Sequence, residues 1–159
     1  MGILVTDKEL LAKTEAILEK SFGKIDSRSE LFAFNLTDYY EEEMGKDLLR
    51  CWISFERLID PYLLCGVKVK TNKIEEKLSI QGKRRVNIDP GYIESAKLVL
   101  ASTKNFSHRT YLDKGIYTEI TLIYENKKFC ELRWTYPDYK TDTALKFFTE
   151  VRKKYLDSI

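Results

Sequence analysis

The sequence predicts an α+β fold, with a largely antiparallel sheet of six to seven strands and about three helices packed on it. Three observations lead to this prediction. Residues 84–139 alternate strand-like runs with short turn motifs, and three other stretches carry apolar residues at helical spacing. The chain of 159 residues contains no repeat, linker or low-complexity segment, so we expect a single domain over residues 1–159.

The composition limits the classes of function. Hydrophobic residues make up 43% of the chain and charged residues 33%, which is typical of a globular protein. The 27 Lys and Arg against 25 Asp and Glu give a net charge of +2, too small to favour nucleic acid as a partner. No apolar run is long enough for a membrane span. Cys51, Cys65 and Cys130 lie in apolar runs, which favours buried thiols and a cytoplasmic location. Abundant Lys and Glu with one Gln suggest a heat-adapted source.

The first predicted element is a helix over residues 7–22. Thr6 and Glu9 have the spacing of a capping box, apolar residues then recur at helical spacing, and Gly23 ends the run. Residues 30–36 lack a polar face, which is typical of a strand covered on both sides. Residues 37–45 fit either a helical turn or a loop.

The middle of the chain predicts a strand and a second helix. Residues 47–56 alternate between apolar and polar side chains, which predicts a strand. Asp60 and Pro61 then favour the start of a helix over residues 61–79. A polar stripe of Lys68, Asn72 and Glu75 runs beside its apolar face, and its simplest interpretation is a solvated flank.

The predicted sheet follows in residues 84–139. Pro90 and Gly91 predict a turn after its first strand. Asp113 to Gly115 suit a three-residue hairpin loop, and Asn126 and Lys127 suit a two-residue turn. The predicted strands cover residues 85–89, 97–103, 108–112, 116–125 and 128–136. A last helix begins after a cap at Thr141 or Asp142 and ends in basic residues.

The two hairpins predict which side chains lie side by side. A two-residue turn sets Ile123 opposite Cys130 and Glu119 opposite Trp134, and a three-residue loop sets Arg109 opposite Glu119. We therefore predict one row across three strands, made of Arg109, Glu119 and Trp134. The row is either a buried structural pair with an aromatic neighbour or the floor of a pocket.

A wider set of polar residues could converge on the same row. These candidate ligand-binding residues are Lys68, Asn72, Glu75, Arg85, Asn87, Asp89, Lys104, His108, Arg109, Glu119, Trp134 and Asp138. Their basic and aromatic side chains would suit a small anionic ligand, nucleotide-like or phosphorylated. The alternative is a protein-interaction subunit that uses Tyr39, Tyr40, Tyr136 and Tyr139. The sequence does not distinguish an enzyme from a binding protein, nor does it indicate an oligomeric state.

Five segments resemble an uncharacterised bacterial and archaeal family of domains of unknown function. The segments are SRSELFAFNLTDYYEEEMG (27–45), NIDPGYI (87–93), LVLASTKNFSHR (98–109), GIYTEITLIY (115–124) and WTYPDY (134–139). Some members of the family are labelled GTP-binding, and the resemblance implies no established activity. The chain has no GxxxxGK[ST] loop to hold phosphates.

The single histidine excludes several kinds of site. Zinc sites with several histidines and the H-E-x-x-H arrangement cannot form within one chain. His108 could be a general base, although strand alternation would turn it to the opposite face from Arg109. No metal site is predicted, but Glu75, Asp89, Glu119 and Asp138 could supply carboxylates to magnesium.

Overall fold

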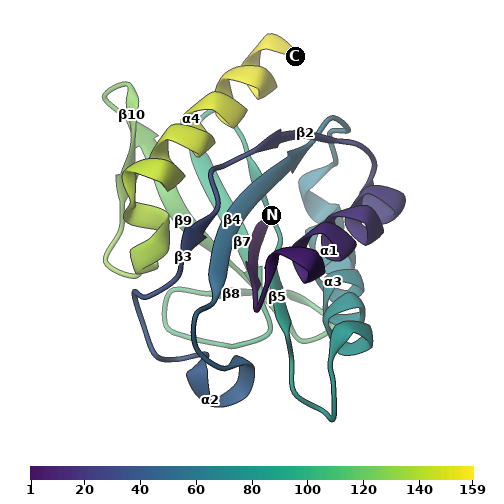
Figure 1. Cartoon of the computed structure of the whole chain (residues 1–159). Coiled ribbons are helices and arrows are strands. Elements are labelled where there is room, and N and C mark those ends of the chain that lie inside the picture. Colours follow the sequence, from purple (N-terminus) through teal and green to yellow (C-terminus); the bar gives the residue numbers. More distant parts are fainter. The chain divides into compact units, whose positions relative to one another are not determined.

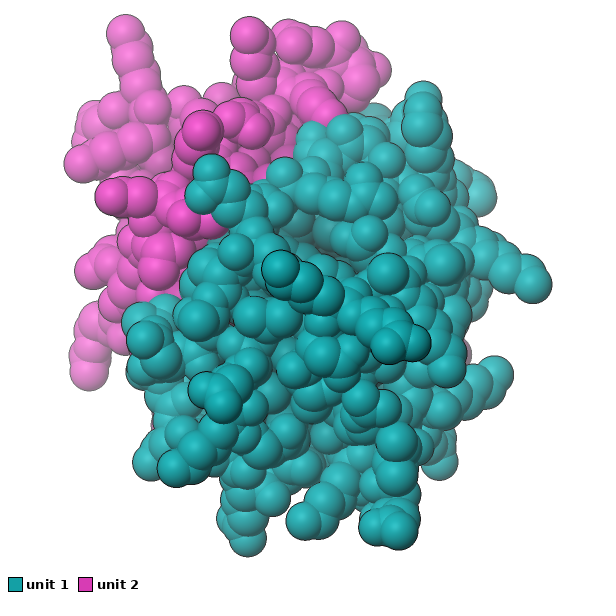
Figure 2. Space-filling view, viewed as in Figure 1, with its two compact units in different colours: residues 1–59, 70–88 teal, residues 60–69, 89–159 magenta.

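The computed structural model describes all residues 1–159 and confirms the α+β class. It contains ten strands and four α-helices (Figure 1). The strands form two sheets of five, where the sequence predicted one sheet of six to seven. The chain divides into two compact units, one of residues 1–59 and 70–88 and the other of residues 60–69 and 89–159 (Figure 2). The single domain over 1–159 stays a prediction.

The sheet of the first unit is ordered β2-β4-β1-β5, and β3 also pairs with β4. The central strand of this sheet, β4, confirms the strand predicted over residues 47–56. The strands are β1 (Gly2–Val5), β2 (Ile25–Arg28), β3 (Phe32–Ala33), β4 (Leu49–Phe55) and β5 (Val86–Asp89). The predicted strand over 30–36 is reduced to the two residues of β3.

Strands β1 and β2 were not predicted. All four residues of β1 are buried, and Ile3 pairs with Cys51 of β4 in an antiparallel ladder. A strand this short, buried on both faces, has no alternation of polar and apolar residues that a sequence pattern could reveal.

The predicted first helix is confirmed as α1 (Lys8–Phe22), but its cap differs. Asp7 is the N-cap residue and its Oδ1 accepts a hydrogen bond from the Leu10 amide at 2.8 Å. The hydroxyl of Thr6 donates to Asp7 instead of capping the helix. The predicted capping box of Thr6 and Glu9 is therefore wrong, because the carboxylate one residue later takes the same role.

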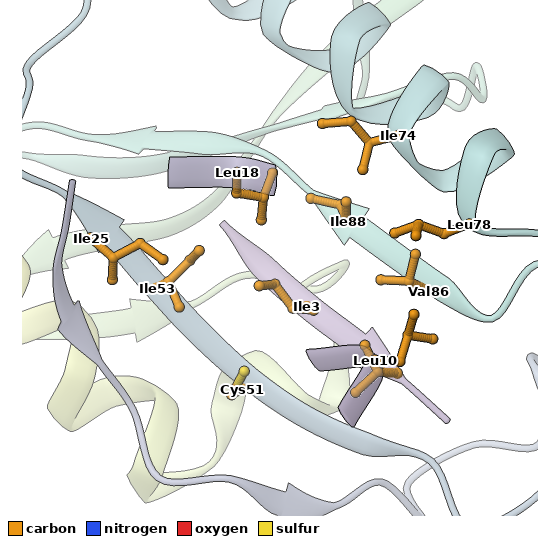
Figure 3. Packing of buried hydrophobic residues seen from close by; sticks show 11 residues of the cluster. Ile3, Leu10, Leu18, Ile25, Cys51, Ile53, Ile74, Leu78, Val86 and Ile88 are labelled. Atoms are coloured by element: carbon orange, nitrogen blue, oxygen red, sulfur yellow. The ribbon is translucent and has the colours of Figure 1, made fainter. Parts of the chain in front are cut away.

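The helix predicted over 61–79 is confirmed as a 3-10 turn, Pro61–Leu63, that continues into α3 (Leu64–Leu78). The boundary between the two units lies within α3. Its 70–78 half and α1 pack on the sheet of the first unit, where apolar side chains from both helices meet those of β1, β4 and β5 (Figure 3). Labelled members of this core include Leu10, Leu18, Ile53, Ile74 and Ile88.

Residues 37–45, left open by the sequence, contain the short helix α2 (Glu41–Met44). Met44 is buried in a small apolar cluster with Leu4 and Leu48. This anchor explains why the acidic segment folds back onto the first unit.

The sheet of the second unit is ordered β10-β9-β7-β6, with β8 also paired to β9, and the pairings are antiparallel. Its strands are β6 (Gly91–Ile93), β7 (Lys97–Ser102), β8 (Thr110–Asp113), β9 (Ile116–Glu125) and β10 (Lys128–Glu131). The turn predicted at Pro90 and Gly91 is wrong, because Gly91 already pairs with Leu100 as the first residue of β6.

The hairpin of β9 and β10 has the predicted turn but a shorter second strand. Asn126 and Lys127 both have positive φ, and the predicted pair of Ile123 with Cys130 is confirmed. The strand predicted over 128–136 ends at Glu131, where the Thr135 hydroxyl accepts from the Leu132 amide at 2.7 Å. This side-chain bond competes with the ladder. The predicted opposition of Glu119 and Trp134 within a ladder is therefore wrong.

The loop between β8 and β9 is shorter than predicted. Tyr111 pairs with Tyr117 as expected, but Asp113 pairs with Ile116, so the register shifts between Tyr111 and Asp113. Only Lys114 and Gly115 form the turn, and both have positive φ.

The last helix is confirmed as α4 (Asp142–Asp157), with the Thr141 hydroxyl as its cap. It packs beside β10 (Figure 1) and β6 of the second unit. Phe148 of α4 stacks on the buried Tyr139. No helix in the structure combines the length and the apolar composition that crossing a membrane requires. The three cysteines are free thiols, and Cys51 and Cys65 are buried.

Candidate functional site

The candidate site lies at an interruption in one edge of strand β9. One edge of β9 pairs with β7. On the other edge, β8 ends its pairing at Thr118 and β10 begins at Leu122. Side chains of the following turn cover the interval, because Trp134 Nε1 donates to the Ile120 carbonyl at 2.8 Å and the Thr135 hydroxyl to the Thr121 carbonyl at 2.5 Å. Trp134 and Thr135 therefore bond to the part of this β9 edge that pairs with neither β8 nor β10.

A β-bulge marks the same interval. Leu98 of β7 pairs with Leu122, while its neighbour Val99 pairs with Ile120, so Thr121 is an extra residue in β9. Bulges turn side chains out of the regular alternation and are frequent beside functional sites. Here the Thr121 hydroxyl lies 3.4 Å from Oε1 of Glu119.

Glu119 is the buried centre of the site and is only 2% exposed. Its Oε2 accepts a hydrogen bond from Arg109 Nε at 2.7 Å and lies 3.0 Å from His108 Nε2. A buried carboxylate needs such partners, since an uncompensated charge is costly to bury. The predicted proximity of Arg109 and Glu119 is confirmed.

Arg109 uses each of its guanidinium nitrogens within the chain. Besides its bond to Glu119, Nη1 donates to the Lys104 carbonyl at 2.9 Å and Nη2 to the Tyr136 hydroxyl at 2.5 Å. Arg109 thus ties the 104–109 loop, β9 and the 132–136 turn together, so its role is to build the site.

His108 shares Glu119 with Arg109, so its predicted placement on the opposite face is wrong. The reason is that β8 begins only at Thr110, so His108 lies in a turn without strand alternation. Its ring stacks on Trp134 at 4.9 Å with an interplanar angle of 8°, and Phe106 packs at 5.4 Å. Its Nδ1 makes no hydrogen bond within the chain and is not sealed from solvent.

Tyr136 presents a second polar group beside Arg109. Burial, together with the Glu119 carboxylate, raises the pKa of Tyr136 to about 12. The phenol therefore keeps its proton at neutral pH. Its oxygen accepts from Arg109, and its own hydrogen has no acceptor within the chain. We call His108, Arg109, Glu119, Trp134 and Tyr136 the Glu119 site.

The raised pKa of Tyr136 predicts a loss of stability at alkaline pH. Tyrosine ordinarily titrates near 10.0, below the value of about 12 in the folded chain. The resulting stabilisation is complete below pH 10 and is lost as the pH rises from 10 to about 12. Free energies of unfolding measured by urea denaturation should therefore fall more steeply over this range for the wild type than for Tyr136→Phe. Equal pH dependence in both proteins would contradict the assignment.

Two of the predicted site residues lie instead in a cluster of the first unit. Arg84 holds Glu43 of α2 at 2.6 Å and also donates to Glu75 at 3.3 Å and to Asn87 at 2.9 Å. Glu75 further accepts from the Ile88 amide at 2.7 Å. The bond to Glu43 raises the pKa of Arg84, and the pKa of Glu43 is lowered in turn. These contacts fix α2 and α3 in place.

The remaining candidates have separate positions. Arg85 pairs with Asp7, the N-cap of α1, at 2.8 Å. Lys68 and Asn72 both lie on α3. Lys68 is buried and belongs to the second unit, and Asn72 is half-buried and belongs to the first. Asp89 and Asp138 lie close enough to Tyr136 for their carboxylates to help raise its pKa. Lys104 joins the site through its carbonyl, and its side chain is exposed.

The carboxylates proposed for magnesium are not grouped. No set of three or more His, Cys, Asp or Glu side chains is arranged to hold a metal ion. Glu119 is engaged by Arg109 and His108, and Glu75 by Arg84 and a backbone amide.

The aromatic residues of the interaction-subunit alternative differ in exposure. Tyr39 is 59% exposed and Tyr136 37%, whereas Tyr139 is 1% exposed and cannot meet a partner. The alternative itself stays a prediction.

Sequence reasoning missed the roles of Phe106, Thr121 and Tyr136 in the site. Phe106 precedes His108 by two residues and Tyr136 follows Trp134 by two, so both are close in sequence to predicted members. Residues 132–136 were predicted to be part of a strand, and strand alternation does not predict a contact between Tyr136 and Arg109. The bulge at Thr121 has no sequence pattern of its own.

Comparison with known proteins gives one match. The model of the family described as "Domain of unknown function (DUF4416)" matches residues 1–155. No curated protein and no solved structure matches the chain.

Proposed function

Because the chain belongs to the DUF4416 family, a domain of unknown function, we propose its function from the Glu119 site: the protein binds a small anionic ligand, nucleotide-like or phosphorylated, through His108 and Tyr136. The observation that carries this proposal is the arrangement of His108. One ring nitrogen is held by a buried carboxylate, while the other makes no hydrogen bond within the chain and is not sealed from solvent, in a side chain that is 13% exposed.

The polar groups of the site suit an anion. In its protonated form His108 donates from both nitrogens, from Nε2 to Glu119 and from Nδ1 to a ligand. The Tyr136 hydroxyl supplies a second donor, polarised by Arg109. Among the five residues of the Glu119 site, the charges of Arg109 and Glu119 offset each other, so a protonated His108 gives this set a net positive charge; the carboxylates of Asp89 and Asp138 lie outside the set but act on Tyr136.

The aromatic side chains suit a planar group on the ligand. Trp134 is 38% exposed and Phe106 is 65% exposed, and the rings of both contact the His108 imidazole. Planar bases commonly stack on exposed aromatic rings. A nucleotide combines such a base with an anionic group, which is why we favour this class.

Ligand-induced thermal stabilisation tests the proposal. We expect nucleoside phosphates, pyrophosphate or sugar phosphates, screened with and without magnesium, to raise the melting temperature by several degrees, since a ligand at about 100 times its Kd adds about 2.7 kcal/mol. His108→Gln and Tyr136→Phe should lose this response while their circular dichroism shows a folded chain.

Tyr111→Phe is the matched control. Tyr111 is 57% exposed on β8 and contacts Tyr117 rather than the Glu119 site. This variant should respond as the wild type does. The proposal would be wrong if no compound in the panel changed the melting temperature, or if the response survived in both site variants.

A further inference from the structure

We infer that His108 is a catalytic base and that Glu119 is the residue that positions it. Neutral His108 takes a proton from the ligand at Nδ1, and the protonated ring then donates a hydrogen bond from the same nitrogen to the ligand anion. The inference rests on the proposed function for the nature of the ligand, but its geometric basis is independent of any ligand.

The hydrogen-bond partners of Glu119 determine where the His108 proton resides. Arg109, which remains protonated in proteins, contacts Oε2 of Glu119 at 2.7 Å, so this carboxylate is an ionised acceptor. His108 Nε2 lies 3.0 Å from the same oxygen and must therefore carry hydrogen. In neutral histidine the other nitrogen, Nδ1, then holds the free lone pair. That lone pair is the group that a general base requires.

The aromatic neighbours fix the direction of this lone pair. Trp134 lies parallel to the imidazole at 8°, and the Trp134 indole is itself anchored to the Ile120 carbonyl at 2.8 Å. Turning the ring over would exchange Nε2 for a carbon atom and break the bond to Glu119. Hydrolytic triads orient their histidine in the same way, with a carboxylate on one ring nitrogen and a reacting group on the other.

The proton balance follows from these contacts. No hydroxyl or thiol side chain of the protein hydrogen-bonds His108, so the proton comes from an O–H of the ligand or of a water molecule. As that O–H bond breaks, the proton binds Nδ1 and the ring becomes cationic beside the Glu119 carboxylate. The oxygen that keeps the electron pair is stabilised by the Tyr136 hydroxyl, which Arg109 polarises at 2.5 Å. Glu119 thus contacts both His108 and Arg109, and Arg109 in turn contacts Tyr136, so one hydrogen-bonded chain links the base, its positioning residue and the anion-stabilising donor.

Carbethoxylation by diethyl pyrocarbonate measures the availability of the lone pair without any ligand. The ring nitrogen bonds to a carbonyl carbon of the reagent, and the anhydride C–O bond breaks. The departing ethyl carbonate takes up the ring proton through solvent and decomposes to carbon dioxide and ethanol. Because the chain has only one histidine, the absorbance change of the N-carbethoxyimidazole reports on His108. Peptide masses then place the adduct on His108 rather than on a lysine or tyrosine, and His108→Gln provides the blank.

At mildly alkaline pH, where histidine is ordinarily neutral, we expect His108 of the native protein to react within about tenfold of the rate of N-acetylhistidine. Glu119→Gln should slow the reaction about tenfold, because a charge-assisted hydrogen bond to the ring is replaced by a weaker one. Glu119→Asp, which keeps the charge, should restore part of the rate. A native protein that reacts only after unfolding in urea, or a folded Glu119→Gln protein with the wild-type rate, would overturn the inference.

A second measurement on the wild type covers the case in which Glu119→Gln fails to fold. The ¹⁵N spectrum of the imidazole distinguishes the two neutral tautomers. The inference requires hydrogen on Nε2, and a spectrum with hydrogen on Nδ1 overturns it.

The outcomes separate this inference from the proposed function. Rapid carbethoxylation with hydrogen on Nε2, together with no response to the anion panel, supports the base and rejects the anionic ligand. A ligand response lost in His108→Gln, with the hydrogen found on Nδ1, supports the binding site and rejects the base.

Discussion

Replacing Glu119 by glutamine is expected to lower the free energy of unfolding by about 3–5 kcal/mol, the range found when one partner of a buried ion pair is removed. Glutamine has nearly the same shape, so no cavity forms and the loss comes from the charge. Arg109, whose side chain is 10% exposed, would remain as a buried cation with one carbonyl oxygen in place of a carboxylate. Urea denaturation followed by circular dichroism measures the change.

Two controls isolate the buried charge. Glu56→Gln removes an exposed partner of Lys24, in a pair whose side chains are 67% and 75% exposed, and should cost less than about 1 kcal/mol. The double variant Glu119→Leu with Arg109→Leu should be more stable than Glu119→Leu alone, because it leaves no unpaired charge. A Glu119→Gln protein within about 1 kcal/mol of the wild type would contradict a buried ion pair at the centre of the site.

The second large effect is expected at Gly91, where β6 begins. A Cβ atom added there would lie 2.3 Å from the Val99 carbonyl oxygen and 2.6 Å from a methyl carbon of Leu100. The first of these atoms belongs to the backbone of β7 and cannot move without disturbing the β6–β7 ladder. We expect Gly91→Ala to lower the free energy of unfolding by about 3 kcal/mol, the upper part of the range for overpacking.

Gly66 is the matched control for this substitution. It lies in α3, and an added Cβ would meet no atom within 4 Å. Alanine is the better helix former, so Gly66→Ala should raise the free energy of unfolding by about 0.5–1 kcal/mol. If both variants changed stability in the same direction by similar amounts, the close approach of β6 and β7 at Gly91 would be wrong.

Periodic elements could be predicted from the sequence because each exposes one face and buries the other. β4, β9 and α4 carry clear alternation or helical spacing, and all three are present. β1 has no such pattern, since its four residues are buried on both faces. The division into two sheets was missed for a related reason. Pro90 and Gly91 resemble a turn, yet Pro90 alone separates Asp89, the last residue of β5 in one sheet, from Gly91, the first residue of β6 in the other.

The candidate site was partly predictable for the same reasons. The loop predicted at Gly115 was one residue too long, but the register shift between Tyr111 and Asp113 keeps Tyr111 opposite Tyr117 as predicted, and Arg109 and Glu119 meet. His108 and Trp134 could not be placed in this way, because both lie in turns where side chains do not alternate. Their positions depend on contacts distant in sequence, such as that of the Trp134 indole with Ile120. A sequence pattern reports local geometry, and this site is made by tertiary contacts.

The geometry also changes the role expected of each predicted residue. Glu119 and Arg109 were candidates for direct ligand contact, but their burial and internal hydrogen bonds make them the support of the site. In the proposed function, the ligand therefore contacts the two side chains that they hold, His108 and Tyr136. The site thus consists of a buried charged pair beneath two polar groups that retain hydrogen-bonding capacity.

A nuclear magnetic resonance titration of the His108 imidazole can decide whether the Glu119 site binds an anion through a ring with hydrogen on Nε2. His108 is the only histidine of the chain, so it gives a single set of ring signals. The ring ¹⁵N and ¹³C signals would be followed as a nucleoside phosphate or pyrophosphate is added to the wild type. The account predicts hydrogen on Nε2 in the free protein and a saturable shift of the Nδ1 signal that Tyr136→Phe weakens. Hydrogen on Nδ1 in the free protein, with no shift at any ligand concentration, would contradict it.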